Sequence, residues 1–301
     1  MKHRLWRSTL SRDRAQAYTF LIPAFLYLLV LSLYPLGYSL YLSLTDWSIL
    51  KKGDPVSFEG LKHFFVLFRD PAFRTSMTFT LKFFAAALPL ETLLGLALAL
   101  IITYERLPRR AANLFRIIIV MPVIIIPSVA GIVWRTVFTI RYGPINYFTS
   151  LLGLAEIPWL GDPRWAFFSV LMVELWRYNP LVTLIFVGGL LGVPKDQVES
   201  AHMDGCSPLR VFQHVYIPYL KPIFLVVLLI RTMDLLKRFD FIYTLTNGGP
   251  GFATQVATLY IQKTAIEDFD FNLGAAASWV LLLIVLPFSL FMIVRMFVPR
   301  D

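Results

Sequence analysis

The chain has 301 residues, of which 57% are hydrophobic and only 16% are charged, and its mean hydropathy is +0.66. A soluble domain carries about 25% charged residues and needs polar surface to cover its core. The composition therefore excludes an ordinary soluble protein and predicts that lipid surrounds much of the chain. The single cysteine, Cys206, excludes a disulfide within the chain and any multi-cysteine metal site.

The net charge of +9 raises the question of nucleic acid binding. The basic residues, however, lie between long apolar runs, which is typical of the flanks of membrane helices. We therefore expect a lipid bilayer, and no nucleic acid, as a partner.

The N-terminal segment superficially resembles a signal peptide, because basic residues (Lys2, Arg4, Arg7, Arg12, Arg14) precede an apolar run. That run continues to about Leu44, far beyond a signal sequence, and no cleavage site stands out. We expect residues 1–16 to be a cytoplasmic tail and residues 17–301 to form one transmembrane domain.

Spanning helices need roughly 20 mostly apolar residues. The sequence predicts an all-α, polytopic protein with six of them, at 17–43, 76–103, 113–134, 166–191, 217–237 and 274–298. The second contains Glu91, and the fourth contains Glu174 and Arg177. The fifth gives the weakest signal, since its uncharged stretch runs only from Pro222 to Ile230.

The loops predict the orientation, because short cytoplasmic loops are rich in Lys and Arg. The N-terminal tail and the loop around Arg106, Arg109, Arg110 and Arg116 are short and dense in positive charge. This puts both termini and the 192–216 loop in the cytoplasm, and the 44–75, 135–165 and 238–273 loops outside. The outer loops are not poor in basic residues: Lys51, Lys52, Lys62, Arg69 and Arg74 lie there.

The loop 192–218 contains two helix start signals and one stop signal. Pro194 suits a first helical turn, and Gly205 can adopt the left-handed conformation that ends a helix. Ser207 and Pro208 form an N-cap and N1 pair that starts a second short helix, through about His214, and Pro218 marks entry into the next span. The loop therefore predicts a compact helix–turn–helix unit.

Three consecutive residues, Glu199, Ser200 and Ala201, are followed after three residues by Gly205. After nine more residues comes the stretch Val-Tyr-Ile-Pro, which ends at Pro218. This pattern resembles the EAA loop of ABC importer permeases. Ser200 replaces the second alanine of that pattern. Further stretches are similar to the maltose-type and glycerol-phosphate-type carbohydrate branch: Tyr34-Pro35, Tyr142 to Asn146, Trp159 to Pro163, and Phe239 to Pro250.

The resemblance implies a type I, binding-protein-dependent importer of a sugar or oligosaccharide in a bacterial-type inner membrane. The partners would be a second permease subunit, an ATP-binding subunit dimer and an extracytoplasmic solute-binding protein. ATP and Mg²⁺ would bind to the ATPase, so this chain would be no enzyme and would hold no cofactor. The residues implied in coupling to the ATPase are Glu199, Ser200, Ala201, Asp204, Gly205 and Pro218.

Charged side chains inside spanning helices cost about 2.5–3.5 kcal/mol each on insertion scales, so they usually face a cavity or a partner. Glu174 and Arg177 have the spacing of a pair on one helical face, and Arg231, Asp234 and Arg238 share another face. We expect these faces to line the translocation path. Glu91 has no obvious partner in the sequence.

The resemblance supports this path. In maltose-type members the sugar site lies on the helix before the EAA loop and on the helix before the Asn-Gly-Gly-Pro stretch. This implies sugar-facing positions for Tyr178, Leu181, Arg231, Asp234, Leu235 and Arg238. Charges stand where the maltose-type pattern is neutral, which leaves open a different sugar, including an acidic one. It is equally open that these charges only satisfy each other.

Two other classes remain as alternatives. An ion-gradient-driven secondary transporter could use the same charges, but it usually shows two repeated halves, and none is visible. A membrane-embedded enzyme would need clustered acids or histidines. No phosphate-binding loop of the Gly-x-x-x-x-Gly-Lys-Ser/Thr type occurs, and the four histidines have no metal-ligand spacing.

Overall fold

A computed structural model describes residues 18–49, 55–103 and 108–297. Within these residues the chain is helical and contains no strand, only an isolated bridge between Thr45 and Phe58. The all-α prediction is therefore confirmed. The chain divides into two compact units, one formed by Met1–Leu67 with Thr264–Trp279 and the other by Phe68–Lys263 with Val280–Asp301.

The first unit contains the helix Tyr18–Ser43, the start of α3 (Lys62–Arg69), and the π turn η3 (Lys263–Glu267). Two contacts join its distant segments. The Asn272 side chain donates a hydrogen bond of 2.7 Å to the Thr45 carbonyl, and the Trp47 and Phe271 rings pack edge to face. These contacts tie the start of α14 (Phe271–Phe297) to the end of α2 (Tyr34–Ser43).

Two π turns lie just before prolines. The turn η1 (Leu29–Leu33) precedes Pro35, and η2 (Phe212–Tyr216) precedes Pro218. Proline lacks the N–H that would bond to the carbonyl four residues earlier, and its ring collides with that carbonyl. A widened turn removes the collision while the helix continues.

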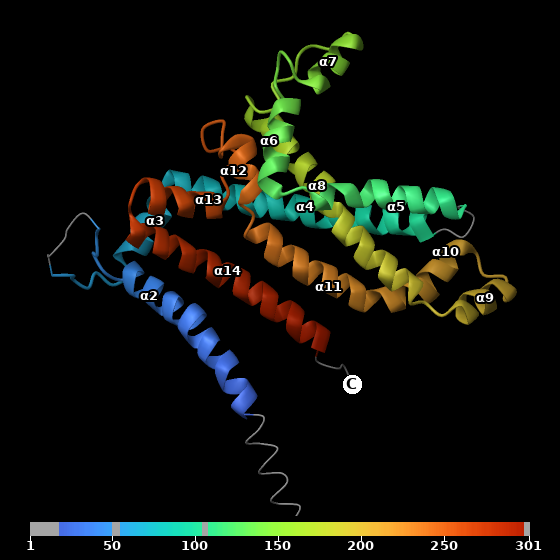
Figure 1. Cartoon of the computed structure of the whole chain (residues 1–301), viewed down its shortest axis with the longest axis horizontal. Helices are drawn as coiled ribbons and strands as arrows, with labels where there is room; N and C mark the ends of the chain where they lie inside the picture. The colour runs from blue at the N-terminus through green and yellow to red at the C-terminus, as the bar shows by residue number, and fades with distance from the viewer. Residues whose placement is uncertain (1–17, 50–54, 104–107, 298–301) are drawn as a thin grey trace, which may run out of the picture. The chain divides into compact units, whose positions relative to one another are not determined.

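The second unit is built around α4 and α8, which pack along each other and against α11 (Figure 1). Gly95 of α4 permits the close approach, because a β-carbon there would lie 2.5 Å from the Val182 side chain of α8. The elements of this unit are α4 (Pro71–Thr103), α5 (Arg109–Ile124), α6 (Pro127–Val137), α7 (Pro144–Leu151), α8 (Pro163–Leu191), α9 (Lys195–Met203), α10 (Pro208–Val211), η2, α11 (Ile217–Leu236), α12 (Asp240–Thr246), α13 (Ala257–Gln262) and the part of α14 from Val280 onward.

The third predicted span, 113–134, is not one straight helix. It consists of the end of α5 and the start of α6, which meet at a bend of 105°. The bend follows from Pro127, because a residue before proline avoids the helical conformation. Ile125 and Ile126 are accordingly extended, with ψ of 131° and 133°.

Among the residues that the structure describes, four helices are long and apolar enough to span a membrane: Tyr18–Ser43, Pro71–Thr103, Pro163–Leu191 and Phe271–Arg295. They match the first, second, fourth and sixth predicted spans. The bent pair would make a fifth. The predicted fifth span forms as α11, which has 20 residues, but Lys221, Arg231 and Asp234 keep it below the same apolar criterion. The count of six is therefore not fully confirmed.

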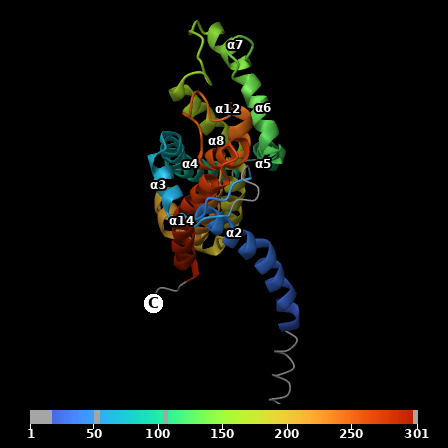
Figure 2. The same cartoon turned by 90° about the vertical axis from the view of Figure 1, so that its left-hand side faces the viewer.

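The segment around α7 lies at the far end of α6 in both views (Figures 1 and 2). Buried Asn146 organises it: the amide nitrogen donates to the carbonyls of Ile140 and Ile157, and the amide oxygen accepts from the Ile157 N–H and the Trp159 ring. A single side chain thus closes the loop that the Tyr142-to-Asn146 and Trp159-to-Pro163 stretches form.

An added methyl group should have opposite effects on stability at two glycines that lie within helices. At Gly131 a β-carbon would lie 2.0 Å from the Thr244 hydroxyl and 2.6 Å from the Phe241 carbonyl, so α6 and α12 would have to separate. At Gly188 nothing lies within 4 Å. We expect Gly131→Ala to lower the free energy of unfolding by about 1–3 kcal/mol and Gly188→Ala to leave it unchanged or raise it by up to about 1 kcal/mol.

Thermal denaturation of the two variants in detergent tests this pair. Equal midpoints for both would contradict the close α6–α12 contact.

Candidate functional site

The predicted helix–turn–helix unit forms, as α9 and α10 on either side of Gly205. Helix α9 is followed by Asp204 as its C-cap, and Gly205 has φ of +73°. The Cys206 N–H donates to the Ala201 carbonyl and the Gly205 N–H to the His202 carbonyl, both at 3.0 Å. This crossed pair of bonds is the Schellman motif that ends helices at a left-handed glycine.

The Schellman motif explains the spacing between Ala201 and Gly205. The Ala201 carbonyl accepts the bond that spans more residues, from the Cys206 N–H. The left-handed glycine must therefore stand four residues after Ala201. A residue with a β-carbon at Gly205 would meet no neighbour within 4 Å, and only its backbone conformation would be strained.

This unit is almost entirely exposed. Helix α9 buries no residue, and Met203 and Leu209 are 88% and 66% exposed. Glu199, Ser200, Asp204 and Pro218 are also exposed, and Ala201 is half-buried. A helix without a buried face gains little stability from its own chain, and this exposed surface is available to a partner.

The sequence predicts that the second short helix ends near His214, before Pro218. In the structure the helix does not end there. Helix α10 continues through η2 into α11 without a break, and Ser207 is its N-cap with Pro208 in the first turn. The π turn replaces the expected stop, because it accommodates Pro218 within a continuing helix.

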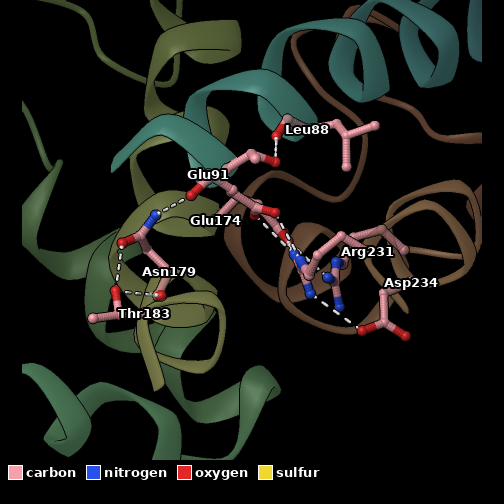
Figure 3. Close-up of polar contacts among 9 residues, drawn as sticks. Leu88, Glu91, Glu174, Asn179, Thr183, Arg231 and Asp234 are labelled. Carbon is pink, nitrogen blue, oxygen red and sulfur yellow. Dashed lines mark hydrogen bonds and ion pairs between the residues drawn. The ribbon is translucent and has the colours of Figure 1, made fainter. Parts of the chain in front are cut away.

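A buried network of charges joins α4, α8 and α11 (Figure 3). The Arg231 guanidinium donates to both oxygens of Glu91, at 2.7 and 2.8 Å, and to Glu174 at 2.6 Å. The same Glu174 oxygen accepts from Arg238 at 2.7 Å. Arg231, Glu91 and Glu174 have no exposed surface, so each charge depends on these bonds for its solvation.

Glu91 therefore has a partner that sequence reasoning missed. Arg231 lies 140 residues away along the chain, and no spacing rule connects the two. Asn179 of α8 makes a second contact with Glu91, because its side-chain amide donates a hydrogen bond to the Glu91 backbone carbonyl at 2.9 Å (Figure 3).

The expected pair between Glu174 and Arg177 does not form, whereas Arg231 and Asp234 do pair, at 3.2 Å. Glu174 bonds instead to arginines of the α11 segment. Arg177 lies over the ring of Tyr178, 4.8 Å from its centroid. The helical spacing allowed the pair, but cations across the helix interface bond to one oxygen of the carboxylate, Oε1, instead.

Tyr178 lies at the centre of three guanidinium groups. Arg231 and Arg238 also lie over its ring, at 4.9 and 3.8 Å from the centroid. Such contacts are favourable because the face of an aromatic ring is negative. Three guanidinium groups (Arg177, Arg231, Arg238) thus lie over one half-buried aromatic side chain.

The predicted path residues differ in their access to a solute. Asp234 has a 40% exposed side chain, and Tyr178 and Leu181 are half-buried. Leu235 is fully buried in the core that includes Phe83, Val170 and Val173. Its side chain packs inside the chain's own core, and a place for Leu235 on the sugar path stays a prediction.

Three buried atoms of the network have no hydrogen-bond partner within the described chain: Glu174 Oε2, Arg177 Nε and Arg238 Nε. The network therefore retains one acceptor and two donors beside Tyr178.

Residues 91–300 match the family model of the binding-protein-dependent transport system inner membrane component. The chain belongs to this family. Its members are membrane components of transporters, so the chain is not itself an enzyme, and a family of this kind does not favour an ion-gradient-driven transporter. The family also supports a multi-pass location in the inner membrane.

Two curated relatives cover nearly the whole chain. A probable ABC transporter permease protein of Sinorhizobium fredii is 34% identical over 92% of this chain and 89% of its own length. The trehalose/maltose transport system permease protein MalF of Thermococcus litoralis is 32% identical over 93% of this chain and 92% of its own length. The resemblance to carbohydrate-type ABC importer permeases is thus confirmed.

Two solved structures share the fold. A bacterial ABC transporter involved in the import of the acidic polysaccharide alginate gives a TM-score of 0.82 at 21% identity, covering 98% of this chain and 100% of that chain. A bacterial alginate ABC transporter in complex with an alginate pentasaccharide-bound periplasmic protein gives 0.79 at 21% identity, covering 96% of each chain. These likenesses confirm the importer permease architecture.

The network predicts a large difference between two of its acids. Glu91→Gln leaves the buried Arg231 with one carboxylate fewer and should lower the free energy of unfolding by about 3–5 kcal/mol. Asp234→Asn removes one half-exposed ion pair and should cost about 1 kcal/mol or less. Thermal denaturation of the purified protein measures both.

A double-mutant cycle is the control for Glu91. The variant Glu91→Gln with Arg231→Gln should lose less stability than the two single variants added together, because both charges are gone. Additive losses would contradict a direct ion pair.

Proposed function

We propose that this chain is the permease subunit of an ATP-driven, binding-protein-dependent importer of a sugar or oligosaccharide, and that a separate ATPase drives alternating access through the α9–Gly205–α10 unit. The observation that carries the proposal is this unit: a pair of short helices joined by a Schellman turn, mostly exposed, in a chain of the importer family. Its exposed Met203 and Leu209 are apolar surface that a partner would cover.

The proposed partners are a second permease subunit, an ATP-binding subunit dimer and an extracytoplasmic solute-binding protein. The family description, which names binding-protein dependence, supports the last of these. Further support comes from the similar transporter that was solved with a solute-bound periplasmic protein. ATP and Mg²⁺ would bind to the ATPase subunits and not to this chain.

The proposed orientation places both termini and the α9–Gly205–α10 unit in the cytoplasm. Support comes from the dense basic residues of the N-terminal tail and of the loop before α5. The segments around α7 and α12 would then lie outside, toward the solute-binding protein.

The proposed solute is a sugar or oligosaccharide, since the relatives' names include trehalose and maltose. Tyr178 and Asp234 are the accessible members of the charge network and would contact it. The buried members Glu174, Arg177, Arg231 and Arg238 would hold these two in place. An acidic sugar is compatible with the three arginines around Tyr178.

Gly205→Ala tests the coupling role against a matched control. Gly205 and Gly153 have φ of +73° and +71°, and an added β-carbon meets nothing within 4 Å at either. The left-handed conformation costs an alanine about 1–2 kcal/mol at both positions. We expect Gly205→Ala to reduce uptake and solute-stimulated ATP hydrolysis severalfold, and Gly153→Ala to leave both near the wild-type rate.

The measurement uses the whole importer in proteoliposomes, with ATPase retention after detergent purification as a second readout. Normal uptake and normal ATPase retention in Gly205→Ala would overturn the proposed coupling role. Equal losses in both variants would mean that backbone strain acts through general instability.

Asp234→Asn tests solute contact, with Asp268→Asn as the control, because Asp268 is an exposed acid of the loop before α14, outside the network. We expect Asp234→Asn to change the apparent affinity or the preference between neutral and acidic oligosaccharides, while the thermal midpoint shifts little. Unchanged affinity and preference would remove Asp234 from the solute path.

A further inference from the structure

A second polar site lies away from the charge network, in a pocket of about 660 Å³ between the N-terminal ends of α4 and α8. Its charged lining consists of Arg74 and Lys82 from α4 and Arg164 from α8, and no carboxylate lines it. Phe79, Phe167 and Phe168 form its apolar wall. The pocket is therefore lined by both cationic and aromatic side chains, and each of the two helices contributes both kinds.

The three cations are not neutralised within the described part of the chain. None of them takes part in an ion pair there. The two acids nearest in sequence are occupied elsewhere: Asp70 accepts from the Ala72 N–H and the Tyr260 hydroxyl, and Asp162 caps α8 through the N–H groups of Arg164 and Trp165. Three free positive charges converge on one pocket.

Two of the three cations come from the same helix. Arg74 and Lys82 both line the pocket and are eight residues apart on α4, which is about 12 Å along the axis. Helical side chains lean toward the helix N-terminus, which is the direction from Lys82 to Arg74. Both helices also present their N-termini here, and the positive ends of their dipoles add to the field.

The surroundings of the pocket favour a lipid over a soluble anion. Leu81 and Phe168, beside and within the pocket, are 41% and 55% exposed on two helices that are apolar enough to span a membrane. Acyl chains cover such side chains in a bilayer, whereas a soluble anion would leave them in contact with water. A ligand that fits both sides has an anionic head and apolar chains.

We propose that this pocket binds the head group of an anionic phospholipid, with the phosphodiester between Arg74, Lys82 and Arg164 and an acyl chain along Phe167 and Phe168. On the proposed orientation it is a lipid of the outer leaflet. This also explains why Arg74 stands on the side of the membrane where basic residues are usually few.

The test compares the triple variant Arg74→Gln, Lys82→Gln, Arg164→Gln with a control of equal charge loss. The control is Arg135→Gln, Arg141→Gln, Lys237→Gln, because these three cations are exposed and do not line the pocket. The importer complex is purified from nanodiscs of phosphatidylglycerol and phosphatidylethanolamine, and retained lipid is measured by native mass spectrometry.

We expect wild type and control to retain phosphatidylglycerol and the pocket variant to bind it roughly 100-fold more weakly, since each basic residue near an anionic lipid surface contributes about 1 kcal/mol. Equal phosphatidylglycerol retention by the pocket variant and the control would overturn the proposal.

Two arms need only the wild-type protein, so they decide the matter even where the triple variant does not fold. In one, phosphatidylglycerol is titrated against phosphatidylcholine, and equal retention of both lipids would overturn an anionic head-group site. In the other, millimolar inorganic phosphate or galacturonate is added. Displacement of the lipid by these would identify a soluble-anion site instead. Neither arm depends on uptake, so failure here leaves the proposed transport function untouched.

Discussion

The structure of the second unit depends on one buried cation. Arg231 has no exposed surface and stands on a helix that would lie within a membrane, where an unpaired charge is expensive. Its guanidinium group satisfies this requirement only by bonding carboxylates from two other helices, Glu91 of α4 and Glu174 of α8. These three helices therefore cannot slide past one another without breaking bonds to a buried charge.

The same requirement explains why α4 and α8 approach closely at this level. Gly95 lets α4 approach Val182, and Asn179, three residues before Val182, donates to the Glu91 carbonyl. Close packing places Glu91 within reach of Arg231, and the ion pair in turn fixes the rotation of α4. Packing and charge pairing thus specify one register together, which neither would do as strongly alone.

The sequence predicted well wherever the determinant is local. A left-handed glycine after a helix, a proline in a first turn and a long apolar run act within a few residues, and Gly205, Pro208 and the four long helices follow them. The bend before Pro127 has an equally local cause, but hydropathy alone averages over it.

The sequence could not predict partners across helices. Arg177 stands at helical spacing from Glu174 and was the predicted partner. Glu174 instead bonds to Arg231 and Arg238, which lie more than fifty positions away along the chain. Glu91 had no candidate at all. Charges in spanning helices signal that partners exist, but their identity depends on which helices pack together.

Because α10, η2 and α11 are continuous, one helix connects the α9–Gly205–α10 unit to the charge network. From Pro208 to Leu236 the helix is continuous, about 43 Å along its axis at the usual rise per residue, and it contains the π turn η2 before Pro218, a kind of position at which helices bend. Its first turn belongs to the exposed α9–Gly205–α10 unit, and Arg231 lies near its other end. On the proposed coupling role, a force on that unit would be carried along this helix to the bonds with Glu91 and Glu174.

The bonds of Arg231 with Glu91 and Glu174 have two mechanical consequences. While they hold, α4 and α8 must move with α11 as one body, because separating them would leave a charge buried without a partner. Asp234 of α11 and Tyr178 of α8 belong to the same network. On the proposed coupling role, motion that begins at α9 and α10 would therefore reach the proposed solute contacts through the continuous helix and its ion pairs.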